Sequence, residues 1–93
     1  MTYEQLLATA KKLEGETLKT VTGREFTVRV YMDCPFFTPL STRQGRSDGR
    51  LAAERFVERF NQIGSFRPRD YQDLSRNASY LVVLAEHALG QDR

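Results

Sequence analysis

The spacing of apolar residues changes along the chain, and each change predicts a different element. In residues 3–14 apolar residues recur at helical spacing, which is typical of an amphipathic helix. These residues are Leu6, Leu7, Ala10 and Leu13. Thr2 stands where it can cap the helix, and Gly15 stands where helices commonly end. The first part of the chain therefore predicts one helix over residues 3–14.

Further along, apolar and polar residues alternate, which is the pattern of strands with one buried face. The alternation runs through residues 18–22, breaks at the turn signal Gly23-Arg24, and resumes through residues 26–32. This arrangement predicts an antiparallel β-hairpin.

A second turn and a third strand are expected after the hairpin. Asp33-Cys34-Pro35 has the composition of a turn, and residues 36–38 can form a short strand beyond it. Pro39 then weakens any continuation, because proline donates no hydrogen bond to a neighbouring strand. The third strand is therefore expected at an edge of the sheet.

The second half of the chain predicts a loop followed by helices. Residues 41–49 are polar and contain two glycines, so we expect a loop that is mobile or ordered by a ligand. A helix with one apolar stripe follows over residues 49–63, then a short helical turn over 68–74, and then a helix over 78–89 that is apolar almost all round. The residues placed to start these helices are Ser47 or Asp48, Pro68 and Asn77.

Because the strands come first and most helices follow, the chain is expected to be α+β rather than built on a parallel sheet. We expect the N-terminal helix, an antiparallel β-hairpin or three-stranded sheet, and then three helices packed on one face. The 93 residues suffice for a single domain over residues 1–93. A thin sheet leaves the apolar helix 78–89 partly uncovered, so a homodimer is expected to bury it.

Composition narrows the class of protein further. Apolar residues make up 40% and charged residues 28% of the chain, as in ordinary soluble domains. The single cysteine, Cys34, excludes an internal disulfide and favours the reducing cytoplasm. The N-terminus has no signal-peptide pattern, and the longest apolar run, residues 80–85, is too short to span a bilayer. We therefore expect a cytoplasmic protein that does not associate with membranes.

Arginine is concentrated in the middle of the chain. Residues 34–76 carry eight arginines and five acidic residues, a net charge of +3, whereas the whole chain carries +2. Clustered guanidinium groups suit phosphate and carboxylate oxygens, so this stretch indicates an anionic partner.

These charges can also balance one another on helix surfaces. Arg50 and Glu54 stand four residues apart, which is an attractive spacing on a helix. Arg55 and Arg59 also stand four residues apart, and their like charges repel each other. An acidic partner would reduce this repulsion. A second chain could supply this partner, and so could Asp70 and Asp73 of the same chain.

The loop before the long helix is a candidate anion site. Free backbone N–H groups and the positive end of a helix favour an anion at residues 41–47. Arg43, Arg46 and Arg50 would add charge there, and the serine and threonine hydroxyls would add donors. The lysine and the spacing of a Walker phosphate loop are missing. The alternative interpretation is a solvated, flexible connection.

Residues 66–89 have the outline of a helix-turn-helix, with a short helix, a three-residue break and a longer helix. Placed after an antiparallel hairpin, this segment resembles small winged-helix and helix-turn-helix DNA-binding domains. The resemblance implies that the start of the last helix faces a DNA groove and that the arginines before it contact phosphates. The groove-facing residues would be Arg76, Asn77, Ser79 and Tyr80, and the phosphate-contacting residues Arg67 and Arg69. The alternative is two core helices joined by a capped turn.

Catalytic and metal-binding patterns are weak in this sequence. Cys34 has only His87 as an imidazole partner, and nothing beside it would stabilise a thiolate. One cysteine and one histidine among scattered carboxylates form no metal-ligand cluster. The carboxylate pairs fall on helix faces expected to be exposed, which suits solubility better than catalysis. We therefore expect no enzymatic activity, no metal and no cofactor.

These observations favour a small nucleic-acid-binding or regulatory module that contacts phosphates through an Arg-rich surface. Its DNA- or RNA-binding residues would be Arg43, Arg46, Arg50, Arg67, Arg69, Arg76, Asn77 and Tyr80. This interpretation requires the loop arginines and those of residues 67–76 to share one face. The first alternative is a protein-interaction module that places the same arginines on an acidic protein and self-associates through its last helix. The second is an anion-binding protein that uses the loop.

The aromatic residues leave two interpretations open. Six of them could stack on bases or line an interface, although in a small domain such residues are more often core. The candidates are Tyr31, Phe36, Phe37, Phe66, Tyr71 and Tyr80.

Overall fold

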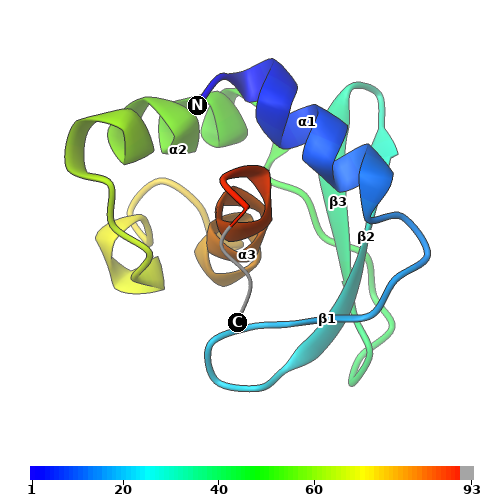
Figure 1. Cartoon of the computed structure of the whole chain (residues 1–93). Coiled ribbons are helices and arrows are strands. Elements are labelled where there is room, and N and C mark those ends of the chain that lie inside the picture. Colours follow the sequence, from blue (N-terminus) through cyan, green and yellow to red (C-terminus); the bar gives the residue numbers. More distant parts are fainter. Residues whose placement is uncertain (91–93) are drawn as a thin grey trace.

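The computed structural model describes residues 1–90 and shows an α+β chain with three α-helices and a three-stranded antiparallel sheet (Figure 1). In chain order the elements are α1 (Tyr3–Lys12), β1 (Leu18–Lys19), β2 (Glu25–Tyr31), β3 (Cys34–Pro39), α2 (Gly49–Ile63), the short 3-10 helix η1 (Pro68–Asp70) and α3 (Ala78–Ala88). The expected α+β class, N-terminal helix and three-stranded antiparallel sheet are confirmed.

The expectation of three helices after the sheet is wrong. The helix expected over residues 68–74 is only η1 followed by turns, so two α-helices follow the sheet. Such a short segment cannot hold a helix without tertiary support, because the first turn of a helix is costly to form. Here the tertiary contacts favour a turn instead. The ring of Tyr71 is fully buried against Phe56, and its hydroxyl donates to the backbone oxygen of Ser65 at 2.7 Å.

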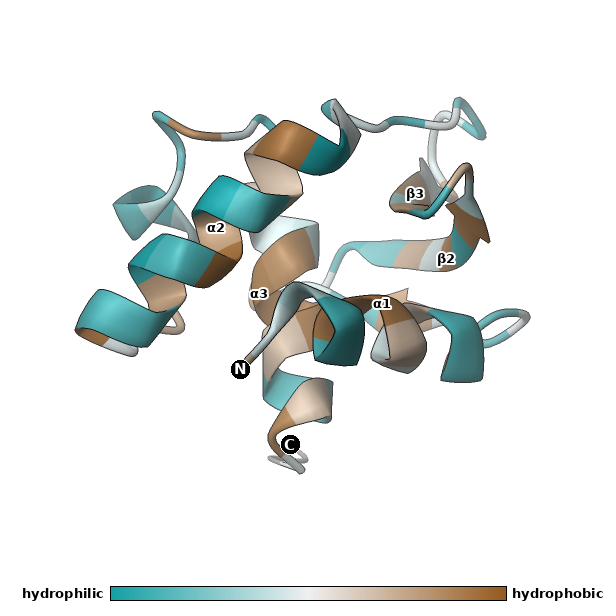
Figure 2. Cartoon of the chain, turned by 90° about the horizontal axis from the view of Figure 1, so that it is seen from above, coloured by the Kyte–Doolittle hydropathy of each residue, from teal (hydrophilic) through white to brown (hydrophobic). Residues whose placement is uncertain are grey.

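Helix α3 occupies the centre of the molecule. Two views at right angles show it between α2 on one side and the sheet on the other (Figures 1 and 2). Its residues are buried almost all round, and Figure 2 shows that most of its length is hydrophobic, whereas α2 alternates between hydrophobic and hydrophilic residues. The chain itself covers α3, which removes the reason for expecting a homodimer. Within the described residues, no helix is long and apolar enough to cross a bilayer.

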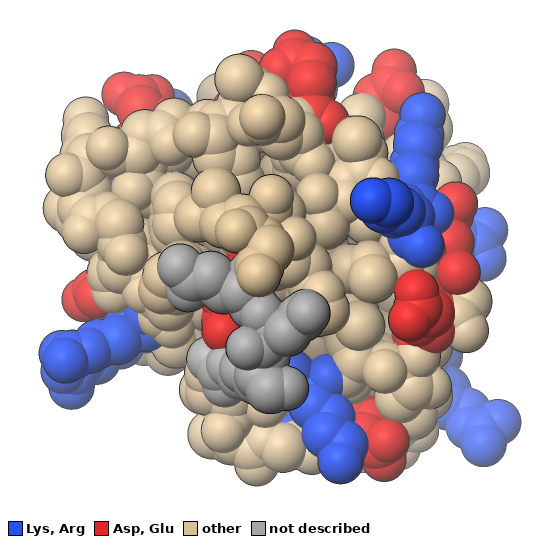
Figure 3. Space-filling view, in the orientation of Figure 1, with Lys and Arg blue, Asp and Glu red and all other residues tan. Residues whose placement is uncertain are grey.

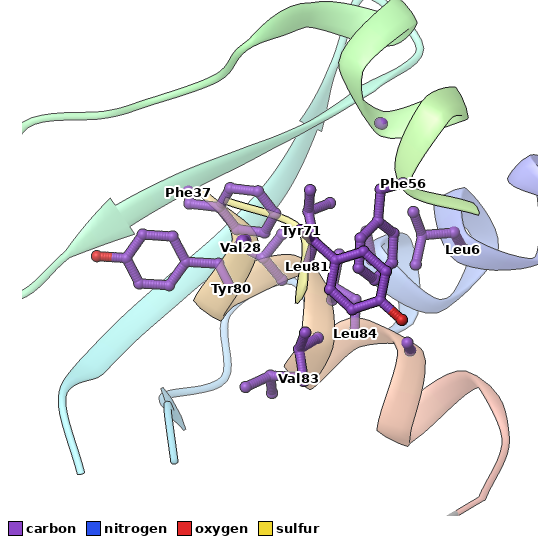
Figure 4. Close-up of a cluster of buried hydrophobic side chains, with 14 of the residues drawn as sticks. Leu6, Val28, Phe37, Phe56, Tyr71, Tyr80, Leu81, Val83 and Leu84 are labelled. Atoms are coloured by element: carbon purple, nitrogen blue, oxygen red, sulfur yellow. The ribbon is translucent and has the colours of Figure 1, made fainter. Parts of the chain in front are cut away.

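One face of the sheet packs on α3. Phe26 and Val28 of β2 and Phe37 of β3 are buried on this face, with Val28 and Phe37 paired across the strands. The ring of Phe37 stacks on Tyr80 of α3 at a centroid distance of 5.3 Å (Figure 4). The ring of Phe26 lies 4.6 Å from the same tyrosine ring. These contacts fix the sheet to the central helix.

The turn between β2 and β3 lies earlier than expected. Met32 and Asp33 adopt positive φ angles of 52° and 57°, and Tyr31 pairs directly with Cys34. A two-residue loop of this kind matches the twist of an antiparallel hairpin. The expected turn at Asp33-Cys34-Pro35 is therefore wrong, because β3 already begins at Cys34 and includes Pro35.

The edge strands are limited by their sequences. β1 stops after Lys19, because the Thr20 N–H donates to the Arg24 backbone oxygen at 2.9 Å and Gly23 takes a positive φ of 87° in the turn. β3 ends at Pro39 and lies at the sheet edge, as its proline predicted.

Candidate nucleic-acid interface

Arg67 and Arg69 lie on the other side of α3 from the loop arginines Arg43 and Arg46 (Figure 1). Arg67 and Arg69 belong to the start of η1, which is yellow in Figure 1. The loop that carries Arg43 and Arg46 begins at the lower end of the sheet, on the other side of α3 (Figure 1). The arginines of η1 and those of the loop therefore do not share one face. Arg76, the last of the arginines in residues 67–76, lies instead beside Asp48 at the end of the loop.

The start of α3 is buried rather than open to a DNA groove. Asn77 is 2% exposed and Tyr80 is 4% exposed, so neither side chain can reach a base edge. Arg76 is exposed, but its backbone N–H donates to the Asp48 carboxylate at 2.8 Å and ties this segment to the start of α2. The groove contacts implied by the winged-helix resemblance are excluded for Asn77 and Tyr80, because α3 is the centre of the core.

Two arginines are neutralised by acidic residues of the same chain. Arg50 Nε lies 3.0 Å from Glu54 Oε1, and its guanidinium carbon lies 4.8 Å from the centre of the Tyr3 ring. Arg59 Nη1 donates to Asp73 Oδ1 at 2.5 Å, and this hydrogen bond raises the pKa of Arg59 and lowers the pKa of Asp73. The expected Arg50–Glu54 pair is confirmed. For Arg59 two sources of an acidic partner were left open, and the structure shows Asp73 of the same chain.

The other arginines of the described chain have no ion pair within it. They are Arg24, Arg29, Arg43, Arg46, Arg55, Arg67, Arg69 and Arg76. On the face seen in Figure 3, the basic side chains stand apart from one another around the rim, with acidic side chains among them. This face therefore carries no broad basic patch.

The face of the sheet opposite the core exposes an aromatic ring beside an arginine. Tyr31 in β2 is 58% exposed, and its ring lies 6.4 Å from the ring of Phe36 in β3, in an edge-to-face arrangement. Arg29 pairs with Phe36 across the strands, and the three side chains line a hollow of about 240 Å³. An unpaired arginine and two partly exposed aromatic rings thus line the same hollow.

The loop before α2 is fastened to the same edge of the sheet. Arg46 exchanges two backbone hydrogen bonds with Phe37 of β3, at 2.6 and 2.8 Å. Gly45 lies against the ring of Phe36, since a Cβ atom at this position would come within 2.0 Å of that ring. The loop was expected to be mobile or ordered by a ligand, but at these residues the sheet itself orders it.

An open depression of about 680 Å³ lies between this loop and the turn that joins β1 to β2. Arg24 from the turn and Arg46 from the loop both line it. Ser41 and Thr42 contribute hydroxyl groups, and Glu25 contributes a carboxylate. Of the arginines predicted to bind an anion, only Arg46 lines this depression, where it lies with a second unpaired guanidinium, that of Arg24.

Arg24 and Arg29 were missed because the sequence interpretation followed the local density of arginine. The alternation over residues 26–32 places Arg29 and Tyr31 on one face of a strand, and this signal could have identified them. No local sequence pattern marks Arg24 as a site residue. Its place in the depression depends on a contact between two turns that are distant in the sequence.

Cys34 and His87 do not form a catalytic pair. Cys34 is buried, and its Sγ lies 3.3 Å from Ser47 Oγ. His87 lies in the last turn of α3, and no hydrogen bond joins it to the thiol in the part of the chain that the structure describes.

Comparisons with protein-family models, with curated proteins and with solved structures found no match for this chain. The chemistry of the sheet face and of the neighbouring depression is therefore what indicates a function.

Proposed function

We propose that this protein binds single-stranded nucleic acid on the open face of its sheet. The observation that carries the proposal is the exposed ring of Tyr31 beside Phe36, with Arg29 lining the same hollow. An aromatic ring stacks on the face of any base, and single-strand-binding surfaces combine such rings with positively charged groups that follow the backbone.

The arrangement favours a single strand over a duplex. Base faces are available for stacking only where bases are unpaired, so the rings of Tyr31 and Phe36 suit a single strand. A duplex would need a wide basic surface, whereas the unpaired arginines of the loop and of η1 lie on opposite sides of α3 (Figure 1). The buried Asn77 and Tyr80 leave no recognition helix.

The loop supplies the phosphate contacts in this proposal. Arg43 and Arg46 are exposed and have no ion pair with the described residues, and Arg46 is held at the sheet edge by its bonds to Phe37. Each neutralised phosphate of a single strand adds about −0.7 to the slope of log K against log salt. A few such contacts predict a weak salt dependence, well below that of proteins with many phosphate contacts.

Fluorescence anisotropy at low ionic strength, with a labelled oligonucleotide of about eight nucleotides, tests the stacking surface. Tyr31→Ala is expected to weaken binding roughly 5- to 150-fold, because one stacked base contributes about 1–3 kcal/mol. Tyr31→Phe is the matched control, and it should bind like the unsubstituted protein because it keeps the ring. Both substitutions change an exposed side chain, so the fold should persist. Equal affinities for the two variants would contradict stacking.

The same assay locates the phosphate contacts with two charge-matched double variants. Arg43→Ala with Arg46→Ala removes two charges at the sheet edge and should weaken binding and flatten its salt dependence. Arg67→Ala with Arg69→Ala removes two charges on the far side and should change neither. Equal losses would mean that net charge alone attracts the strand. Absence of binding by the unsubstituted protein at low ionic strength would refute the proposal.

A second candidate is a protein-binding role for the hairpin tip. Met32 is 82% exposed next to Tyr31, and a protruding apolar pair of this kind fits a hollow on a partner protein. Self-association measured by light scattering would support this candidate if it persisted in high salt and was lost in Met32→Ser.

A further inference from the structure

The depression at the end of the sheet gathers hydrogen-bond donors from three parts of the chain. Arg24 comes from the turn between β1 and β2, whereas Arg46, Ser41 and Thr42 come from the loop before α2. Tyr80 of α3 also lines the depression, and Figure 4 shows its hydroxyl end pointing away from the other labelled side chains of the core. Residues that are distant in the sequence thus surround one space of about 680 Å³.

These donors are not used by the rest of the described chain. Neither Arg24 nor Arg46 makes an ion pair or a side-chain hydrogen bond within residues 1–90. Each guanidinium offers five N–H donors. Thr42 Oγ1 accepts a hydrogen bond from the Gln44 backbone N–H at 3.3 Å, which leaves its own O–H free to donate. The surplus of donors favours an anion with several oxygen atoms.

The charge of the depression limits which anion fits. Two guanidinium groups face one carboxylate, that of Glu25, so the lining carries a net charge of +1. A carboxylate ligand offers two oxygens, and a phosphodiester offers two free oxygens and one charge. A terminal phosphate offers three free oxygens and a charge near −2 at neutral pH. Its oxygens can accept from Arg24 on one wall and from Arg46 on the other.

We propose that this depression binds a terminal phosphate group, that is, a phosphomonoester. Where the phosphate belongs to a nucleic-acid strand, the inference rests on the function proposed above. β2 runs from Glu25 at the depression to Tyr31, a distance of about 20 Å at roughly 3.3 Å per residue. A strand with its end phosphate in the depression and its backbone along β2 would place bases a few nucleotides from that end over Phe36 and Tyr31.

Oligonucleotides of one sequence with a 5′-phosphate, a 3′-phosphate or two hydroxyl ends test this inference by fluorescence anisotropy. One phosphorylated form is expected to bind about tenfold more tightly than the hydroxyl form, which is the effect of a charge-assisted hydrogen-bond contact. Arg24→Ala should abolish this difference. Arg29→Ala is the matched control. It should weaken the binding of all three oligonucleotides and preserve the difference in affinity between the phosphorylated and hydroxyl forms. Equal affinity of the phosphorylated and hydroxyl forms would overturn the inference while leaving the strand proposal intact.

A titration with a nucleoside monophosphate separates the site from the strand. NMR signals of the arginine Nε–H groups are expected to shift for Arg24 and Arg46 and to stay fixed for Arg67. If the nucleotide shifts these signals but no oligonucleotide binds, the depression is a phosphomonoester site for free nucleotides and the sheet-face proposal fails. If neither the nucleotide nor a phosphorylated strand binds, the inference is overturned.

Discussion

At the scale of single residues, the surroundings decide what each side chain can do. Tyr31 is 58% exposed and available to a ligand, whereas Tyr80 of α3 is 4% exposed and its ring packs against Phe37 of the sheet. Arginines differ in the same way. Arg59 is held by Asp73, but Arg46 has no acidic partner among residues 1–90. From residue type alone, Tyr31 and Tyr80 would be expected to behave alike, and so would Arg59 and Arg46.

Tyr3 is expected to make the fold sensitive to alkaline pH. Burial raises the pKa of Tyr3 to about 12, and its hydroxyl donates to the Asp33 backbone oxygen at 2.5 Å. In the unfolded chain the pKa of a tyrosine is near 10. The folded chain therefore holds the proton more tightly, so this stabilisation is complete below about pH 10 and is lost as the pH rises from about 10 to about 12.

Urea unfolding at a series of alkaline pH values measures this loss, which should reach at most roughly 2–3 kcal/mol. Tyr3→Phe should reduce the dependence on pH. It should not abolish it, because burial also raises the pKa of Tyr71. If Tyr3→Phe and the unsubstituted protein lose the same free energy of unfolding at alkaline pH, Tyr3 is not responsible for the loss.

At the scale of elements, a chain of hydrogen bonds joins the starts of α2 and α3. Asp48 precedes α2, yet its side chain makes no capping bond. Its carboxylate instead accepts from Ser75 Oγ at 2.5 Å and from the Arg76 N–H at 2.8 Å. Ser75 Oγ in turn accepts from the Asn77 N–H at 3.0 Å. The end of the Arg-bearing loop is thereby fixed to the central helix.

Removing this junction should destabilise the fold moderately. Asp48→Ala is expected to lower the free energy of unfolding by about 1–2 kcal/mol, because buried Ser75 loses its acceptor. Asp48→Asn should cost less, since the amide oxygen can still accept both hydrogen bonds. Chemical denaturation of the two variants measures the difference. Identical losses would show that the accepting oxygen does not join the helices.

At the scale of the whole molecule, α3 organises a single core that α1, α2 and the sheet surround (Figures 1 and 2). Leu84 in α3 is fully buried, and Leu84→Ala is expected to cost about 2–5 kcal/mol of stability. Leu51→Ala is the control, because Leu51 is 62% exposed and its loss should change stability by at most about 0.5 kcal/mol.

The same denaturation experiments test whether α3 belongs to the core of one chain. If it does, the midpoint of unfolding should not depend on protein concentration. If a second copy covered α3, the midpoint would rise with concentration. A small effect of Leu84→Ala would likewise contradict a central position for this helix.

Local patterns predicted most of the elements. The alternation around Phe26 and Val28 marked the buried face of β2, and the apolar spacing in residues 49–63 marked α2 with its observed bounds. Gly64 ends α2 in the left-handed conformation, with a φ of 61°. These features follow from side-chain periodicity and backbone preference, which act over a few residues and are therefore readable in the sequence.

The candidate site was only partly predictable. From the sequence, Arg46 was one of the arginines predicted to contact an anion, and Tyr31 was one of six aromatic residues with stacking and core as open alternatives. It could not show that Arg24 faces Arg46, that Arg67 lies on the far side, or that Tyr80 is buried. Each of these depends on how segments separated by many residues pack together, and no local pattern records that packing.

By itself, then, the sequence determined the α+β class, the strands with one buried face and a last helix too apolar to be left exposed, because hydrophobic periodicity and capping are local. Only the tertiary structure decided that the chain itself buries α3, that Arg67 and Arg69 lie across α3 from Arg43 and Arg46, and that an aromatic sheet face lies near a depression lined by Arg24 and Arg46. The physical reason is that burial and charge placement depend on distances in space, and those distances are set by the packing of the whole core.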